Sequence, residues 1–381
     1  MRPHLTVSDF SFTLRFDSSE RQPWVRGPVW TRPAPQPRTV RDVCHLARPR
    51  TVSAHYHPGT PIVVTARTIT PPVGGATGSC HPTFPAGPDG VVIAAPAKLN
   101  LYLEILAKRP DGYHELETLM VAIDLYDTLE LHPRIDGRLE LTCYPPGLPT
   151  GPENLVYKAA DRLRRWVDQS DLGSSIRLIK RIPTQAGLAG GSSDAAAAIV
   201  GLNRIWGLDL PKPDLATIAA EVGSDVAFFL NLPAGWCTGR GEIVAPESVS
   251  QPLHIVLVCP PVGLGTADVY RRLAVPELPS TGTAVRAAFR AADPEALGRA
   301  LFNRLQSPAF DLAPIVEAVY CRLAGVNPAG CLMSGSGSAV FAVCRDQQDA
   351  TRVAGAFQAA TPPGEADSRV LVVRTLHVDP A

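Results

Sequence analysis

The sequence predicts an α+β fold built from two blocks, residues 89–250 and 251–381, that follow an extension over residues 1–88. Strand-like and helix-like segments are mixed without strict alternation, which indicates two packed layers rather than a regular βαβ sheet. Each block also contains one loop rich in small residues, and the first of these loops joins directly to an alanine-rich helix start. The extension contains too much proline to sustain either helix or sheet.

Composition limits the classes of function. The chain has 381 residues, of which 45% are hydrophobic, so it can bury the cores of two or three domains. Its formal net charge of zero gives the whole molecule no electrostatic preference for nucleic acid or for an anionic membrane, and we expect neither as a partner. No apolar run approaches the roughly twenty residues that cross a bilayer, and the N-terminus lacks the apolar segment of a signal peptide. The eight cysteines show neither CxxC nor short Cys/His spacing, which favours reduced thiols in a cytoplasmic protein.

Residues 1–88 differ from the rest of the chain. They contain ten arginines, no lysine, four acidic residues and 14 of the 38 prolines. We expect this segment to be disordered, because proline removes hydrogen-bond donors and few acids are present to pair with the arginines. An organellar presequence, a weak nucleic-acid-binding arm and a start codon further downstream are the alternatives.

The first block opens with a predicted strand over residues 91–105 that is interrupted at Pro96. Alternation along the strand places Lys98 and Asn100 on one face and places leucines on the other, Leu99, Leu101 and Leu103. The two polar residues lie either on a solvated sheet face or in a functional site. We also expect a strand and turn over residues 118–131, a helix over 154–167 and a short strand over 176–182.

The loop over residues 183–193 has the composition of a phosphate cradle. Gly187, Gly190 and Gly191 allow close backbone approach, and a helix predicted from about Ser193 to Ile205 would direct its first N–H groups and its dipole at an anion. The loop lacks the Lys of a Walker A motif, and no acidic residue stands where the dinucleotide fingerprint requires one. A flexible turn before a helix is the alternative.

The remaining segments are less specific. A helix is expected over 216–222, and Asp225 directly after it is either a helix N-cap or a buried functional carboxylate. In the second block the pattern predicts a strand over residues 253–259 and helices over 284–302 and 313–323. A glycine-rich turn over 333–338 then leads into a strand over 339–343. By itself that turn is typical of a tight hairpin.

Three segments in this order resemble the three sequence motifs of the GHMP small-molecule kinases: Pro96–Asn100, Pro183–Ser193 and Ser334–Gly337. The resemblance spans roughly residues 91–375. Within that superfamily, Arg109–Leu116 is similar to the segment that holds cytosine in the kinases of 4-diphosphocytidyl-2-C-methyl-D-erythritol. Four shorter segments are also similar to that subfamily, Glu153–Leu155, Gly223–Val226, Gly239–Glu242 and Asn303–Leu305.

The resemblance implies a two-domain GHMP kinase fold, with an ATP-binding N-terminal domain and the active site in the cleft between the domains. It implies Mg²⁺-dependent transfer of phosphate from ATP to the 2-hydroxyl of the cytidyl substrate, a step of the non-mevalonate isoprenoid precursor pathway. Asp225 is then the base, with Lys98 beside it. The implied ATP-binding residues are Pro183, Thr184, Gln185, Ala186, Gly187, Leu188, Ala189, Gly190, Gly191, Ser192, Ser193 and Asn154. Those for the acceptor are Asn100, Tyr113, His114 and Tyr270, and Ser193 is also a candidate Mg²⁺ ligand.

The chain departs from the family pattern at Gln185 and Ala189, where glycine is common. We expect the methyl group of Ala189 to weaken ATP binding at most. One alternative is another GHMP kinase, of the homoserine or mevalonate type, which would not need the Asp-Gly-Tyr-His segment. A second is a non-catalytic GHMP-fold binding protein, against which the presence of both Lys98 and Asp225 argues. The sequence does not determine the oligomeric state.

Overall fold

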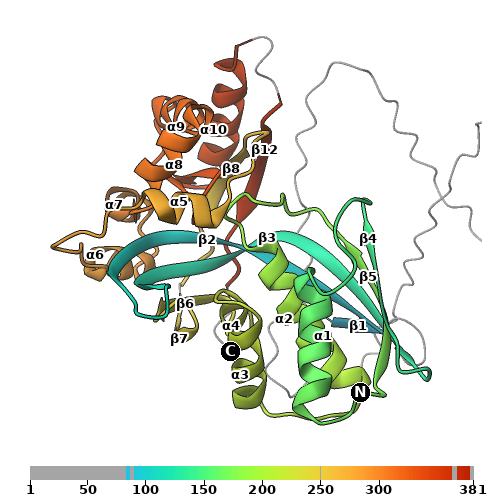
Figure 1. Ribbon diagram of the computed structural model, residues 1–381. Coiled ribbons are helices and arrows are strands. Elements are labelled where there is room, and N and C mark those ends of the chain that lie inside the picture. The colour runs from blue at the N-terminus through green and yellow to red at the C-terminus, as the bar shows by residue number, and fades with distance from the viewer. Residues whose placement is uncertain (1–82, 86–89, 249, 363–366, 378–381) are drawn as a thin grey trace, which may run out of the picture. The chain divides into compact units, whose positions relative to one another are not determined.

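The computed structural model describes residues 83–85, 90–248, 250–362 and 367–377 (Figure 1). The expected disorder of the extension therefore falls, for residues 1–82, outside the described chain. Strand β1 (Thr83–Pro85) lies inside the expected extension and pairs antiparallel with residues 91–93. The sequence places the start of ordered structure near residue 91, but paired structure begins earlier, at Thr83. The expected boundary at residue 88 is therefore too far along the chain.

The larger sheet contains two long strands, β2 (Val91–Lys108) and β3 (His114–Arg134). The strand order is β1-β2-β3-β5-β4, with β6 paired to β3 and β7, and β9 paired to β2. The bounds of the other strands are β4 (Leu139–Tyr144), β5 (Gly173–Ile179), β6 (Ala234–Thr238), β7 (Ile243–Glu247) and β9 (Phe302–Asn303). The turn expected within 118–131 is absent, because β3 runs through this stretch and pairs with β2 on both sides of Asp124 and Leu125, and the stretch contains no Gly or Pro.

A shift of register between Pro96 and Ala97 determines which way the functional part of β2 faces. Before the shift, alternate residues pack into the core beneath the helices, Val91, Ile93 and Ala95. After it, the next odd-numbered residues, Ala97, Leu99 and Leu101, pack into a different core. The extra residues at this shift, Asp124 and Leu125, lie on β3, because Pro96 pairs with Tyr126 and Ala97 with Ile123. Beyond the shift the apolar side chains of β2 leave the core beneath the helices, so Lys98 and Asn100 face the helical side of the sheet. The strand expected to be interrupted at Pro96 is continuous, since β2 runs from Val91 to Lys108, and only its register with β3 shifts there.

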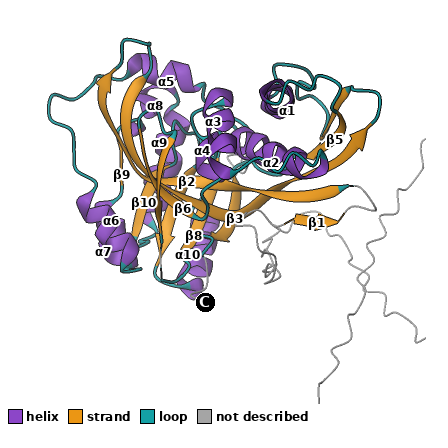
Figure 2. Cartoon of the chain, turned by 90° about the horizontal axis from the view of Figure 1, so that it is seen from below, coloured by secondary structure: helices purple, strands orange, loops and turns teal. Residues whose placement is uncertain are grey.

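Four helices lie on one side of the larger sheet (Figures 1 and 2). They are α1 (Leu155–Trp166), α2 (Gly190–Ile205), α3 (Lys212–Val222) and α4 (Val226–Phe229). Helix α2 begins three residues earlier than expected, and its alanines over 195–198 are fully buried. Small side chains let the helix approach the sheet closely, which places the loop before it beside β2. Among the described helices, none has the length and apolar character needed to cross a membrane.

The second sheet has the order β10-β11-β8-β12, with all neighbours antiparallel. Its strands are β8 (His254–Cys259), β10 (Gly330–Met333), β11 (Val340–Cys344) and β12 (Arg369–Arg374). The helices of this block are α5 (Thr266–Arg272), α6 (Thr283–Arg290), α7 (Pro294–Ala300), α8 (Gln306–Leu312), α9 (Pro314–Gly325) and α10 (Gln347–Ala359). The hairpin expected at residues 333–338 is confirmed as the β10–β11 connection.

The single helix expected over 284–302 is wrong, because α6 and α7 are separate. Asp293 caps α7 by accepting from the backbone N–H of Glu295 and of Ala296, both at 3.0 Å. Pro294 then occupies the first helical position, where its missing N–H costs nothing but where it cannot continue a preceding helix.

The two sheets share one apolar core. It combines residues after the register shift of β2 with residues from β8 and β11, including Leu99, Leu257 and Phe341. Beyond β12, Thr375 forms a bridge to Ile123 of β3. Loops from both blocks are therefore held against the middle of β2.

Candidate active site

Lys98 is the point at which the three sequence motifs meet. Its Nζ donates to Asn100 Oδ1 at 2.5 Å and to the carbonyl of Gly187 at 2.9 Å, and lies 3.7 Å from Asp225 Oδ2. Lys98 is 3% exposed, so a solvated sheet face is the wrong interpretation. Burial lowers the pKa of Lys98, and the carboxylate of Asp225 opposes that effect.

The third motif reaches the same place through Ser334. The Ser334 hydroxyl donates to the Gly187 carbonyl at 3.1 Å and accepts from the backbone N–H of Asn100 at 3.4 Å. Asn100 also donates through Nδ2 to Thr118 Oγ1 at 2.8 Å. A Cβ at Gly187 would lie 1.9 Å from the Ser334 carbonyl oxygen, so only glycine permits this approach.

Asp225 directly precedes α4, and its carboxylate faces Lys98. It occupies the N-cap position, but its side chain makes no capping hydrogen bond. The capping alternative is therefore wrong, and the carboxylate remains available to other partners. The side chain is 30% exposed, so it is reachable from solvent rather than buried as expected. A Cβ at Gly241 would lie 3.6 Å from Asp225 Oδ1, which places the turn over residues 239–241 against this carboxylate.

The loop over residues 183–193 contains three left-handed residues. Their φ angles are +53° at Gln185, +73° at Gly187 and +51° at Ala189. Two of them are not glycine, so the departures from the family pattern fall where the backbone favours glycine. The loop is held from the second block, because the carbonyls of Gln185 and Ala186 accept from the N–H groups of Leu264 and Ala339, each at 3.1 Å.

The start of α2 supplies free donors. Ser193 N–H makes the first backbone bond of the helix, to the carbonyl of Ala189 at 3.0 Å, so the N–H groups of Gly190, Gly191 and Ser192 precede the helical ladder. These donors and the helix dipole can bind an anion such as phosphate. Elsewhere in the loop, Thr184 is exposed and Pro183 half-buried, whereas Ala186 and Leu188 are core residues that support the loop from below.

The hydroxyl oxygen of Ser193 is available as a metal ligand. Its hydroxyl is buried and has no hydrogen-bond partner. The described residues contain no group of three or more His, Cys, Asp or Glu side chains that could hold a metal ion by themselves. A Mg²⁺ ion at this place would therefore take most of its oxygens from nucleotide phosphates, which is common for Mg²⁺ in kinases.

Asn154 has a structural task in addition to its expected one. Its Oδ1 accepts from Val156 N–H at 2.9 Å, which caps α1, and its Nδ2 donates to the carbonyl of Pro149 at 2.8 Å. Both polar ends of the side chain are thus engaged, and its contact with ATP stays a prediction.

The Asp-Gly-Tyr-His segment forms the loop between β2 and β3. Asp111 Oδ1 accepts from Tyr113 N–H at 3.1 Å, and Gly112 has a φ of +87°. This turn leaves Tyr113 51% exposed. The next ring, His114, lies 5.0 Å from that of Tyr270, centroid to centroid. Burial lowers the pKa of His114 and raises that of Tyr270. The structure therefore brings the two expected acceptor residues His114 and Tyr270 together.

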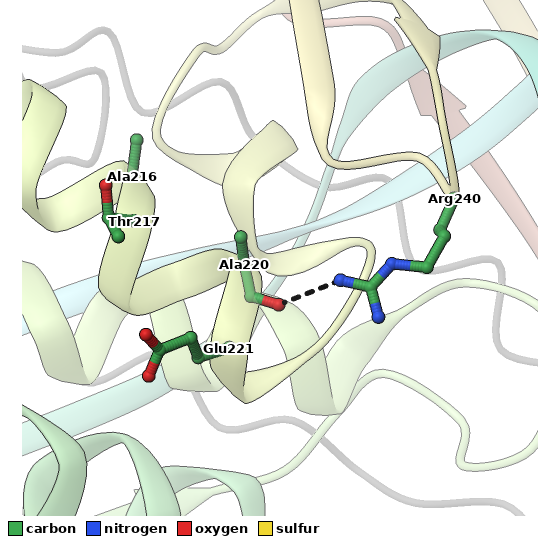
Figure 3. Close-up of a pocket in the computed structure, with 5 residues that line it drawn as sticks. All are labelled: Ala216, Thr217, Ala220, Glu221 and Arg240. Carbon is green, nitrogen blue, oxygen red and sulfur yellow. Dashed lines mark hydrogen bonds between the residues drawn. The ribbon is translucent and has the colours of Figure 1, made fainter. Parts of the chain in front are cut away.

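Arg240 contacts one of the expected acceptor residues, and the sequence analysis did not name it as a candidate. Its guanidinium carbon lies 4.6 Å from the centroid of the Tyr113 ring, a cation–π distance. It extends from a turn whose flanking residues Gly239 and Gly241 both have positive φ. Figure 3 shows it donating to the Ala220 carbonyl, at 3.4 Å, beside a shallow hollow of about 650 Å³. The available signal was the segment Gly239–Glu242, which is similar to the subfamily pattern.

Comparisons with known proteins show the family of this chain. The model of the GHMP kinases N terminal domain matches residues 154–231, and the GHMP kinases C terminal model matches residues 285–362. A 4-diphosphocytidyl-2-C-methyl-D-erythritol kinase of Shouchella clausii (strain KSM-K16) is 40% identical over 262 residues, covering 68% of this chain and 88% of that protein. The kinase of the same name from Pelotomaculum thermopropionicum (strain DSM 13744 / JCM 10971 / SI) is 39% identical and covers 75% of this chain and 98% of that protein.

Solved structures give the same result. A crystal structure of 4-(cytidine 5'-diphospho)-2C-methyl-D-erythritol kinase has a TM-score of 0.61 and 34% identity, covering 74% of this chain and 98% of its own. A homoserine kinase of Cytophaga hutchinsonii also has a TM-score of 0.61, but its 20% identity is a likeness of fold alone. The expected two-domain kinase fold is confirmed. With this coverage and identity, the chain belongs to the GHMP kinases and, within them, to the family of 4-diphosphocytidyl-2-C-methyl-D-erythritol kinases.

Proposed function

We propose that this protein transfers the γ-phosphate of ATP to the 2-hydroxyl of 4-diphosphocytidyl-2-C-methyl-D-erythritol, in the non-mevalonate isoprenoid precursor pathway. The observation that carries the proposal is the meeting of Lys98 with Asp225, at 3.7 Å, and with the carbonyl of Gly187 in the phosphate loop, at 2.9 Å. Transfer to an alcohol needs a held phosphate, a positioned hydroxyl and a group that takes its proton.

Asp225 accepts the proton of the substrate hydroxyl in this proposal. Lys98 pairs with the Asp225 carboxylate at 3.7 Å and meets the charge that develops on the transferred phosphate. Asn100, through its contact of 2.5 Å with Lys98 Nζ, holds the ammonium in place and lies on the side of the sugar alcohol. The contacts of Lys98 with Asn100 and Gly187 fix the ammonium before substrate binds, which reduces the cost of organising the site.

The N–H groups of Gly190, Gly191 and Ser192 bind phosphate oxygens of ATP, supported by the dipole of α2. Mg²⁺, when bound to the nucleotide, neutralises part of the phosphate charge. The unpartnered hydroxyl of Ser193 is the protein oxygen that we assign to it. We infer a binding role for the whole loop over residues 183–193, with Ala186 and Leu188 acting through packing.

The acceptor extends from Asp225 to the rings of Tyr113, His114 and Tyr270, which bind the cytosine. Arg240 supports this path, because its turn lies against Asp225 on one side and its guanidinium lies over Tyr113 on the other. The substrate carries a diphosphate between its cytidine and its sugar alcohol. A guanidinium between the two ends of the site suits such an anion.

An assay for ADP with ATP, Mg²⁺ and the cytidyl substrate tests the function, with homoserine and mevalonate as competing acceptors. We expect turnover with the cytidyl substrate alone, and phosphorylation of either competitor at a comparable rate would contradict the assignment. In the same assay Asp225→Asn should lower kcat by roughly a hundred- to ten-thousand-fold and leave the KM for ATP unchanged, as expected for loss of a general base. Asp214→Asn in the first turn of α3 is the matched control. A loss below about tenfold in Asp225→Asn would leave that residue a positioning role only.

A further inference from the structure

A buried ionic cluster lies at the base of the phosphate loop. Lys180 Nζ contacts Asp127 Oδ2 and lies 2.8 Å from Asp194 Oδ2. The three side chains are 8%, 0% and 2% exposed, respectively. They come from three elements: Asp127 from β3, Lys180 from the end of β5, and Asp194 from the first turns of α2.

This cluster holds both ends of the loop. At the entry, Asp127 Oδ1 accepts from the backbone N–H groups of Arg181 and Ile182, the second at 2.9 Å. At the exit, Lys180 holds Asp194 on the helix that begins at Gly190. The ammonium also lies directly under that start, because a Cβ at Gly190 would be only 2.9 Å from Lys180 Nζ. A single carboxylate–ammonium–carboxylate chain therefore fixes where the loop leaves the sheet and where α2 begins.

The cluster is poorly suited to a purely stabilising role. Two carboxylates share one ammonium, and Asp194 Oδ1 is buried without a hydrogen-bond partner. Buried ion pairs are often no more stabilising than apolar residues of similar size, whereas they do fix geometry. An incompletely satisfied buried acid thus points to a constraint on position.

We propose that Lys180, Asp127 and Asp194 are positioning residues for the ATP phosphates: they hold the N–H groups of Gly190–Ser192 where the triphosphate binds, without touching it. The proposal rests on the proposed function, because it assigns the nucleotide to this loop. It predicts that damage to the cluster acts on the nucleotide and spares the acceptor. A misplacement of about 1 Å in a binding group is enough to cost a hundredfold in rate.

The test replaces Asp194 in the full chain. Asp194→Ala and Asp194→Ser both remove the contact with Lys180, whereas Asp194→Asn keeps an acceptor oxygen of the same shape. Asp161→Ala on α1 is the control, since Asp161 pairs with surface arginines of its own helix. For each variant we would measure kcat, the KM for ATP, the KM for the cytidyl substrate and the Tm.

We expect Asp194→Ala and Asp194→Ser to raise the KM for ATP at least tenfold, with the KM for the acceptor within twofold of the parent. Asp194→Asn should restore the KM for ATP to within about threefold, and Asp161→Ala should change neither constant. A lowered Tm with both KM values unchanged, or an equal rise of both, would overturn the proposal. If Asp194→Ala does not fold, Asp194→Ser carries the same prediction. Failure of the parent chain to phosphorylate the acceptor would instead contradict the proposed function.

Discussion

The contact between Gly187 and Ser334 can be tested by one methyl group. In Gly187→Ala the new Cβ would lie 1.9 Å from the Ser334 carbonyl oxygen and 2.9 Å from its carbonyl carbon. Both are backbone atoms, so a rotamer change cannot relieve the overlap. The two loops must separate by about 1.5 Å to reach ordinary van der Waals contact, and this would break the bonds that the Gly187 carbonyl accepts from Lys98 and from Ser334.

The magnitude follows from those two bonds. A hydrogen bond from a charged donor is worth about 1.5–3 kcal/mol, and one from a neutral hydroxyl about 1 kcal/mol. The φ of +73° at Gly187 adds a backbone cost of roughly 1 kcal/mol for alanine. Gly207→Ala isolates that last contribution, because Gly207 has a φ of +63° and no atom within 4 Å of its added Cβ. The difference between the two variants should therefore be about 2.5–4 kcal/mol, or roughly 6–12 °C in Tm.

Urea unfolding followed by circular dichroism measures the stability of both variants, and the ADP assay measures their turnover. We expect Gly187→Ala to lose at least tenfold in kcat, because Lys98 loses the partner that fixes its ammonium, whereas Gly207→Ala keeps the parent rate. Equal losses of stability in the two variants would refute the close approach of the two loops. Unchanged turnover in a destabilised Gly187→Ala would refute its link to Lys98.

Three further predictions concern the loop, the acceptor site and the extension. Ala189→Gly should raise the free energy of unfolding by about 1 kcal/mol, because glycine accepts a φ of +51° without strain, and should lower the KM for ATP a few-fold in the ADP assay. Tyr113→Ala and His114→Ala should each raise the KM for the cytidyl substrate tenfold or more and leave that for ATP unchanged, since stacking on one aromatic ring is worth roughly 1–3 kcal/mol. A chain without residues 1–82, which retains β1, should keep its turnover and a Tm within about 2 °C of the full chain; loss of ATP binding would show that the extension contributes to the site.

Local signals were sufficient for several elements. Helical spacing over 154–167, with Asn154 before it, predicted α1 to within a residue of its bounds. Pro96 also marked an irregularity, although the strand continues through it and the irregularity is a shift of register with β3. The separation of α6 from α7 was predictable too, because Asp293 followed by proline is a helix-start signal. By contrast, the continuity of β3 depends on pairing with β2, β5 and β6, which are remote in the sequence.

The candidate site shows the same limit. The three motifs could be recognised one by one, and resemblance paired Lys98 with Asp225, but no spacing rule brings residues that are so far apart in sequence to 3.7 Å. Lys180 and Asp127 carried no signal at all, because a lysine after a strand and an aspartate within one are ordinary surface residues until the fold buries them together. Burial changes their chemistry, since in a dry environment a charge must be met by a fixed partner. Residues of this kind can be found only from contacts, and their effect on the phosphate loop can be separated from simple stability only by measuring nucleotide and acceptor binding apart.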